Sequence, residues 1–366
     1  MKKKFISAAS ALACVLSLGA SAQADEVADF YKDKTLTLLL STGVGGSNDL
    51  NGRIFMRYMT KYLPGKPGFK SVNMPGAGHV RASNYLYTRA PQDGTYIGSI
   101  IRFFVLHQAL GGKGVKYDAR KFNFLGSTSS SNVVMTVYHT SGINSFADLK
   151  KKELIVGGTG VGSGTVIFPN LFNTLMGTKI KIVQGYKSGN NINLAIERGE
   201  VFGRAGWSFE SVEATQSDWL KHNKVKFLAQ VGLKREPRYE HIPMAVDLVP
   251  NAKDKPAMEL FARVVAVGSP FITNQGVPKA RVAALENAFN QTVKDPAFIA
   301  ELKKKKLNVR PTHAAELTKI VHDIINAPPD VIAKARGALS RKGLVKCKSF
   351  TSAKYCRSKK KRKKKK

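Results

Sequence analysis

The chain has 366 residues, which is long enough for two domains of ordinary size. It is 43% hydrophobic, with 32 Gly and 15 Pro, and this globular composition excludes a wholly disordered or fibrous protein. The formal net charge is +34, but residues 341–366 hold fourteen Lys and Arg and no acid. The rest of the chain is basic without approaching the charge density of a nucleic-acid packing protein.

The first 24 residues have the three parts of a secretory signal peptide. Lys2 to Lys4 form a charged region, Phe5 to Leu18 form a short apolar run, and Ala22-Gln23-Ala24 supplies small residues before a cleavage point at Asp25. The apolar run is too short for a membrane span, which needs roughly 20 residues. We therefore expect an exported protein that works in the periplasm.

The three cysteines lie at the two ends of the chain. Cys14 falls in the signal peptide, and Cys347 and Cys356 fall in the basic tail, so residues 25–340 contain none. This part of the chain therefore has no disulfide, no thiolate metal site and no cysteine nucleophile. Lipid attachment at Cys14 is disfavoured, because the residues before it match a lipidation signal poorly.

The tail, residues 341–366, ends in a block of eight basic residues after Arg357-Ser358. Such a block repels itself and stays solvated. It could bind nucleic acid or an anionic membrane, at about 1 kcal/mol per basic residue near a lipid surface. We favour a disordered extension, because nothing in residues 25–340 is organised to read nucleic acid.

Strand and helix signals alternate along the body in chain order. Apolar runs of strand length occupy residues 35–41, 69–73, 96–101, 122–126, 132–138, 153–156, 179–183 and 226–231, and helical spacing of apolar residues occupies 50–62, 79–88, 167–175 and 192–196. The segment after Pro278 is mostly helical, with one apolar stripe through Val282, Leu285, Phe289 and Val293. This alternation predicts an α/β fold with mostly parallel sheets flanked by helices.

Several predicted strands run into loops rich in glycine and serine that open helices. These loops cover residues 42–49, 75–78, 157–165 and 185–189, and Ser47 is a candidate N-cap. In α/β sheets ligands bind beyond the carboxyl ends of strands, and helix N-termini there offer free N–H groups to anions. None of the loops has the lysine of a phosphate-binding loop or the full dinucleotide fingerprint, so we expect no nucleotide or other cofactor.

Catalytic and metal-binding patterns are absent from the sequence. The histidines of the body form no i, i+4 pair or metal motif, and Ser129, Ser130 and Ser163 lie outside any G-x-S-x-G elbow. We therefore expect a binding protein that is not an enzyme and holds no metal.

The order of motifs resembles the substrate-binding proteins of tripartite tricarboxylate transporters, the Bug receptor family. The matching pieces include GVGGSNDLNGR (43–53), NMPGAGHVRASNYLY (73–87), APQDGTYIG (90–98), GGTGVGSGT (157–165) and GRAGWS (203–208). Each piece is weak alone, but together they cover nearly all of residues 27–335 in order. His79 and Phe202 depart from the pattern, because relatives usually have Gly and Asp there.

The resemblance implies a two-lobed, flytrap-like receptor with a mostly parallel sheet in each lobe. Lobe one would comprise residues 27–127 and 232–340, and lobe two residues 128–231. A small organic carboxylate would bind between them and pass to the subunits of a membrane permease, and we expect a monomer that binds no nucleic acid. By position, the implied ligand-binding residues are Gly45, Gly46, Ser47, Asn48, Asp49, Gly76, Ala77, Ser129, Ser130, Thr159, Gly162, Ser163, Gly164, Thr165, Tyr186, Gly206, Trp207 and Ser208.

Two alternatives of other classes stay open at this point. One is an exported hydrolase of carboxylate esters that uses Ser163 or Ser129, although no spacing suggests its base and acid. The other is a nucleic-acid or membrane-surface binder driven by the basic tail. The sequence does not determine which carboxylate is bound, how tightly it is bound, or which permease receives it.

Overall fold

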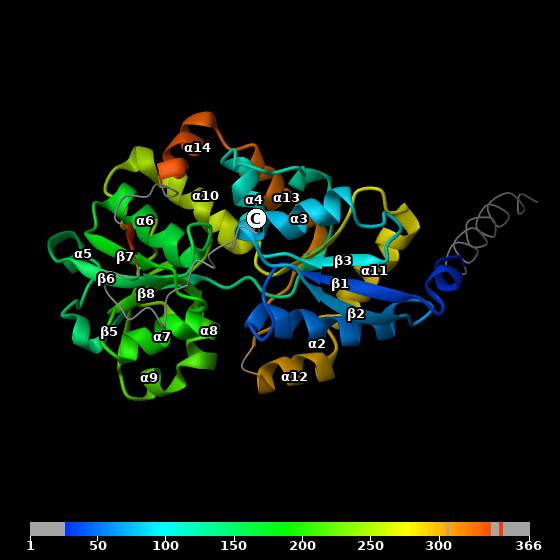
Figure 1. Ribbon diagram of the computed structural model, residues 1–366, viewed down its shortest axis with the longest axis horizontal. Helices are drawn as coiled ribbons and strands as arrows, with labels where there is room; N and C mark the ends of the chain where they lie inside the picture. Colours follow the sequence, from blue (N-terminus) through cyan, green and yellow to red (C-terminus); the bar gives the residue numbers. More distant parts are fainter. Residues whose placement is uncertain (1–25, 306, 338–343, 347–366) are drawn as a thin grey trace, which may run out of the picture.

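The computed structural model describes residues 26–305, 307–337 and 344–346. Its strands form two six-stranded sheets that lie side by side, each with its own helices (Figure 1). We call the sheet that contains β1 and its helices the first lobe, and the sheet that contains β6 and its helices the second lobe. The predicted two-lobed α/β fold is confirmed.

The first lobe carries strands in the order β11-β4-β10-β3-β1-β2. β1 is parallel to both β2 and β3, while β10 is antiparallel to β3 and β4. The strands are β1 (Thr35–Leu40), β2 (Gly68–Asn73), β3 (Tyr96–Ser99), β4 (Asn123–Ser127), β10 (Pro270–Thr273) and β11 (Thr312–His313). The helices around this sheet are α2 (Ser47–Tyr62), α3 (Val80–Thr88), α4 (Phe103–Ala109), α11 (Lys279–Thr292), α12 (Pro296–Lys304) and α13 (Ala314–Ile325).

The second lobe carries strands in the order β12-β7-β6-β8-β5-β9. β12, β7, β6 and β8 are parallel neighbours, and β5 runs against β8 and β9. The strands are β5 (Val133–Tyr138), β6 (Leu154–Gly158), β7 (Ile180–Gln184), β8 (Gly203–Ser208), β9 (Val225–Val231) and β12 (Leu344–Lys346). The helices are α5 (Asp148–Lys151), α6 (Gly164–Met176), α7 (Gly189–Glu197), α8 (Phe209–Thr215) and α9 (Ser217–Lys221). Most strands in each sheet therefore run one way, as predicted.

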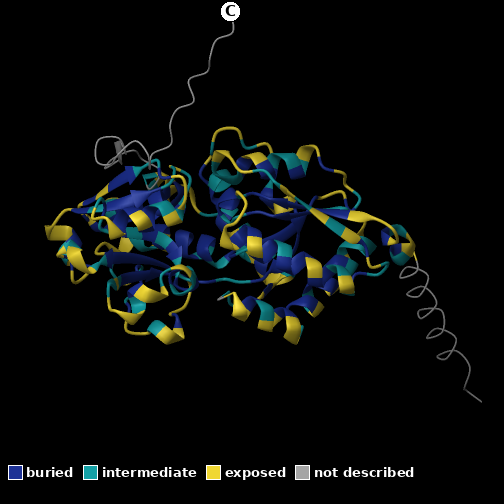
Figure 2. Ribbon diagram, turned by 60° about the horizontal axis from the view of Figure 1, so that its bottom comes forward, coloured by how far each residue is buried: buried dark blue, intermediate teal, exposed yellow. Residues whose placement is uncertain are grey.

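The cores form where the sequence concentrates apolar residues. Leu36, Leu38, Leu39 and Leu40 of β1 are fully buried, as expected for a strand covered on both faces. The predicted apolar side of α6 is likewise buried. Figure 2 shows most strands dark blue inside each lobe, while the edge strand β2 and the outer helices and loops carry exposed residues.

Three chain segments meet where the lobes join. Residues 128–132 lead from β4 to β5, and the Ser269 amide, just before β10, donates to the Ser129 carbonyl at 3.1 Å. The Arg310 amide donates to the Thr128 carbonyl at 3.0 Å. The helices α10 (Lys255–Ala266) and α14 (Pro329–Arg336) pack on each other, and α10 also contacts β9 of the second lobe and α13 of the first.

Two short segments pair with edge strands of the second sheet. Near residue 232, where lobe one is expected to resume, Met244 pairs with Gln230 of β9. Within the basic tail, residues 344–346 form β12 beside β7. In both places an edge strand offers unpaired backbone groups, and the chain pairs with them.

Several sequence predictions fall on residues that the structure does not describe. The signal peptide (1–24), Cys14, Cys347, Cys356 and the basic block after Ser358 lie outside the described residues. Within the described ranges, no helix has the length and apolar character needed to cross a membrane. The same residues contain no cluster of three His, Cys, Asp or Glu side chains suited to a metal ion.

Candidate functional site

A cavity of about 300 Å³ lies between the two lobes. The first lobe contributes residues at the start of α2, after β3 and before β10, and the second lobe contributes the end of β8 and the start of α8. Its lining comprises Ser47, Asn48, Asn51, Ile101, Arg102, Phe103, Ser129, Ser131, Arg204, Gly206, Trp207, Ser208, Glu210, Ser211, Gly268, Ser269, Leu307 and Asn308. β1, β3 and β8 each lead into this lining at their carboxyl ends, where ligands bind in α/β sheets.

Six of the residues expected from the family resemblance line this cavity. They are Ser47, Asn48, Ser129, Gly206, Trp207 and Ser208. Asn48 is buried, and both polar atoms of its amide lack a hydrogen-bond partner among the described residues. A buried amide without partners costs free energy, so this side chain is poised for a polar ligand. Ser47 is not the predicted N-cap, because Gly46 takes that position and Ser47 opens the helix.

The first glycine loop turns its acid away from the cavity. Asp49 accepts hydrogen bonds from the Gly45 amide at 3.0 Å, from Arg53 Nε at 3.0 Å and from Asn73 Nδ2 at 2.8 Å. Burial raises the pKa of Asp49, but these hydrogen bonds outweigh it and hold the pKa below its ordinary value. Asp49 thus stays ionised and fixes the loop. Gly45 and Gly46 are exposed and lie outside the cavity lining.

The hydroxyl groups of the second-lobe loop bond to one another. Ser163 Oγ lies 2.9 Å from Thr159 Oγ1 and 2.7 Å from Thr165 Oγ1, and it donates to the Gly160 carbonyl at 2.7 Å. None of these three side chains lines the cavity. They hold the turn before α6, so their role in the described structure is to shape the loop. Ser163, the candidate nucleophile of the hydrolase alternative, has its hydroxyl engaged by the loop itself.

Other expected residues form the contact between the lobes or lie in a core. A Cβ added to Gly162 would lie 3.1 Å from His107 Nε2 and 3.2 Å from Gly78 Cα, across the lobe boundary. Gly164 packs against Gly206. Tyr186 is fully buried in the second lobe and its hydroxyl has no partner among the described residues.

The remaining expected residues are placed apart from the cavity. Gly76 and Ala77 are exposed in a turn with positive φ, and Ser130 lines a different cavity.

Two arginines in the cavity lining were not singled out from the sequence. Arg102 lies between β3 and α4, at the N-cap of α4, and Arg204 lies in β8, within the quoted motif GRAGWS. The position of Arg102, just after a strand-like run, is the signal that could have identified it. Arg204 lies in a strand, and the alternation of side chains along a strand does not by itself indicate which face of the sheet meets the other lobe.

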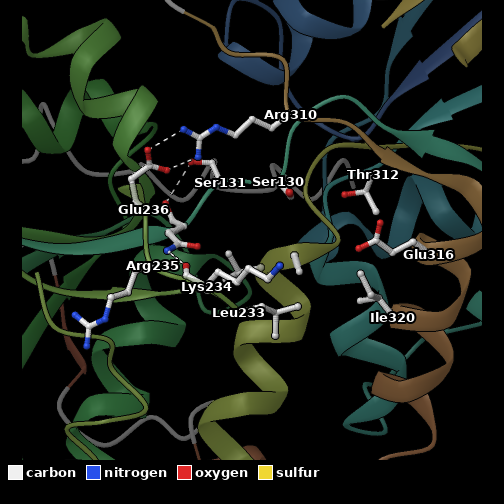
Figure 3. Close-up of a pocket in the computed structure, with 14 residues that line it drawn as sticks. Ser130, Ser131, Leu233, Lys234, Arg235, Glu236, Arg310, Thr312, Glu316 and Ile320 are labelled. Atoms are coloured by element: carbon white, nitrogen blue, oxygen red, sulfur yellow. Dashed lines mark hydrogen bonds and ion pairs between the residues drawn. The ribbon is translucent and has the colours of Figure 1, made fainter. Parts of the chain in front are cut away.

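A second cavity, of about 230 Å³, lies where the connecting segments meet (Figure 3). Its buried acid, Glu236, accepts hydrogen bonds from Arg310 and from Arg238 Nε, the latter at 3.0 Å. The carboxylate of Glu236 is therefore already neutralised by protein groups. Because the first cavity contains polar atoms without partners and this one centres on a paired ion, we take the first as the candidate ligand site.

Ligand affinity is expected to be nearly constant between pH 6 and 8. Burial lowers the pKa of His79 to about 4, opposed by its hydrogen bond to the Ser41 carbonyl and assisted by His107 and Arg102. Burial also lowers the pKa of His107. The His79 ring is thus neutral across this range, while a carboxylate ligand with an ordinary pKa near 4 is ionised. Calorimetric titrations at pH 6, 7 and 8 measure this, and a steep change retained in His79→Gln would contradict the assignment.

Comparisons with known proteins support the fold at low sequence identity. No protein-family model matches the chain, and no curated protein matches it. Solved structures do match. A TctC solute-binding protein from Polaromonas has a TM-score of 0.61 and 17% identity, and the alignment covers 84% of this chain and 99% of that one. MatC from Rhodopseudomonas palustris with bound malate has a TM-score of 0.62 and 19% identity, and the alignment covers 82% of this chain and 99% of MatC.

The periplasmic binding protein BugD has a TM-score of 0.63 and 18% identity, with 84% of this chain and 98% of that chain covered. All three align over almost their whole length. The chain therefore has the two-lobed fold of the periplasmic TctC and Bug solute-binding proteins, as its motifs implied.

Proposed function

We propose that this chain is a periplasmic receptor of the tripartite tricarboxylate transporter type. It captures a small organic carboxylate between its lobes and delivers it to the subunits of a membrane permease. The observation that carries the proposal is the interlobe cavity, where the buried Asn48 amide and the two arginines Arg102 and Arg204 have polar atoms without hydrogen-bond partners among the described residues. The malate bound in MatC supports a carboxylate as the ligand class.

The proposal also covers the lobe boundaries, the export and the oligomeric state of the receptor. The first lobe begins at about residue 27 and the second at about residue 128, where the first connecting segment starts. The receptor is exported by residues 1–24, acts as a monomer and performs no catalysis. The start of α2 adds its free N–H groups to the site, and these favour negative charge.

The first test is a thermal-shift screen of the purified protein with mono-, di- and tricarboxylates. A ligand present at 100 times its Kd adds about 2.7 kcal/mol to the free energy of unfolding. Sodium chloride at matched ionic strength is the control for general salt effects. The proposal fails if no carboxylate raises the melting temperature above this control.

Tryptophan fluorescence tests whether the ligand enters this cavity. Trp207 lines it, whereas Trp219 lies behind Trp207 with ring centroids 6.4 Å apart. Trp219 is itself buried in the second lobe. We expect the ligand-induced change in emission to persist in Trp219→Phe and to be lost in Trp207→Phe. The reverse pattern would place the ligand elsewhere.

A further inference from the structure

Each lobe contributes one arginine to the interlobe cavity. Arg102 comes from the first lobe, where its Nη1 donates to the Val265 carbonyl at 3.2 Å. Arg204 comes from the second lobe, where its Nη1 donates to Asn193 Oδ1 at 3.0 Å. Neither forms an ion pair with any described acid. In both residues Nε is shielded from solvent and has no hydrogen-bond partner among the described residues.

The surroundings of these arginines leave their charge uncompensated. Arg204 lies over the ring of Trp207, with its Cζ 4.2 Å from the centroid, so one face of the guanidinium is covered. Burial lowers the pKa of Arg102 to about 10 and of Arg204 to about 9, and both groups stay protonated at neutral pH. Both arginines are half-buried, and a partly buried charge without an ion-pair partner carries a desolvation cost that a bound anion offsets.

Glu210 is the one acid in the described lining of the cavity, and it is occupied elsewhere. Its carboxylate accepts a hydrogen bond from the Ser131 hydroxyl, lies 3.6 Å from Arg238 and meets Asn308 Nδ2 at 3.5 Å. These partners are Ser131 in the segment that leads from β4 to β5, Arg238 after β9, and Asn308 before β11. Glu210 raises the pKa of Arg102 through its charge, but it does not pair with either arginine.

We propose that Arg102 and Arg204 act together as a two-point anion clamp. Each guanidinium engages one acidic group of the ligand, so the receptor selects small molecules with two ionised acid groups over monoanions. A guanidinium presents parallel N–H donors that match a carboxylate, and such charge-assisted bonds are among the strongest in proteins. This inference rests on the proposed receptor function and assigns its specificity to two side chains.

Placing the arginines on opposite lobes also links ligand binding to the lobe arrangement. A dianion that contacts both guanidiniums bridges the first lobe to the second. A monoanion pairs with one arginine and leaves the other half-buried and without an ion-pair partner. The second acidic group should therefore strengthen binding by roughly ten- to one-hundred-fold, the range expected for one hydrogen-bonded charged partner.

The experiment compares matched ligands by isothermal titration calorimetry. Straight-chain dicarboxylic acids of increasing length are titrated beside their own monomethyl esters, which keep the size and remove one charge. For the best-fitting diacid, the wild-type protein should bind the diacid ten- to one-hundred-fold more tightly than the ester. Equal binding of the two would overturn the clamp.

The variants Arg102→Gln and Arg204→Gln test the two side chains separately. In each variant, the affinity for the diacid should fall to nearly the affinity for its ester. The ester should keep most of its wild-type affinity, because it can still bind the remaining arginine. Arg89→Gln is the control, because Arg89 is exposed and outside the lining. A diacid-to-ester ratio that stays at the wild-type value in both variants would overturn the proposal.

Two further measurements keep the outcomes distinct. If a glutamine variant fails to fold, Arg204→Met and Arg102→Met keep the aliphatic packing of the arginine side chain. The affinities for the diacid and its ester are then compared in these variants. The wild-type ligand comparison depends on no variant at all. If neither diacids nor esters of any length bind the wild-type protein, the receptor function itself is contradicted, whereas equal binding contradicts only the clamp.

Discussion

Replacing Gly206 with alanine is expected to lower the free energy of unfolding by about 3 kcal/mol. Gly206 has φ +73, which side-chain-bearing residues adopt with strain. A Cβ at this position would lie 2.3 Å from the carbonyl carbon and oxygen of Gly164. Those are backbone atoms at the first turn of α6, so they cannot move aside as a flexible side chain would. Urea unfolding followed by circular dichroism measures the loss.

Gly177→Ala is the matched control for this substitution. Gly177 has φ +68, nearly the same conformation, but an added Cβ would meet nothing within 4 Å. Its replacement should cost about 1 kcal/mol, the strain of the left-handed conformation alone. The difference between the two variants isolates the collision with Gly164. Equal losses in both variants would show that the start of α6 and strand β8 do not pack as closely as described.

Replacing Glu236 with glutamine is the second change for which we expect a large effect. The Glu236 side chain is 1% exposed and is held by Arg310 and Arg238, which come from different parts of the chain. The substitution keeps the shape and removes the charge that both guanidiniums contact. We expect a loss of about 2 kcal/mol at pH 7, below the value for a fully buried pair because both arginines are partly exposed.

The loss in Glu236→Gln should also depend on pH. Burial raises the pKa of Glu236, but the hydrogen bonds from Arg310 and Arg238 outweigh it, so the folded-state pKa lies below its ordinary value. The stabilisation is therefore complete above the ordinary glutamate pKa of about 4.3 and disappears as the pH falls through the folded-state pKa.

Urea titrations of both proteins at pH 7, 5, 4 and 3 should show the difference in stability shrinking only below pH 5. Glu240→Gln is the control, because Glu240 is exposed and close in the sequence. It should change stability by less than about 0.5 kcal/mol at every pH. A loss in Glu236→Gln that stays constant to pH 3 would show that the ion pair does not cause it.

The local sequence pattern predicted strands β1 to β7 and β9. It predicted the buried face of some helices correctly and of others only in part. The predicted apolar side of α6, including Ile167, Phe168 and Leu171, is buried as expected. In α2 the predicted face began at Leu50, which is 36% exposed, while Phe55 and Met59 on another side of the same helix are fully buried. A helix packed against both a sheet and α11 buries more than one stripe, and spacing alone does not reveal the second neighbour.

The motif order implied the fold and six of the cavity-lining residues, because glycine loops at strand ends are local features. Tertiary structure decided the rest. Ser163 and Thr165 have the chemistry of ligand contacts, yet their hydroxyls bond within their own loop.

Arg102 and Arg204 lie about a hundred positions apart, and only the meeting of the two lobes places them in one cavity. Sequence determines which groups a segment can offer, because strands, helices and turns follow from local spacing. Which of those groups remains without a partner, and so is available to a ligand, depends on contacts between distant segments that exist only in the folded chain.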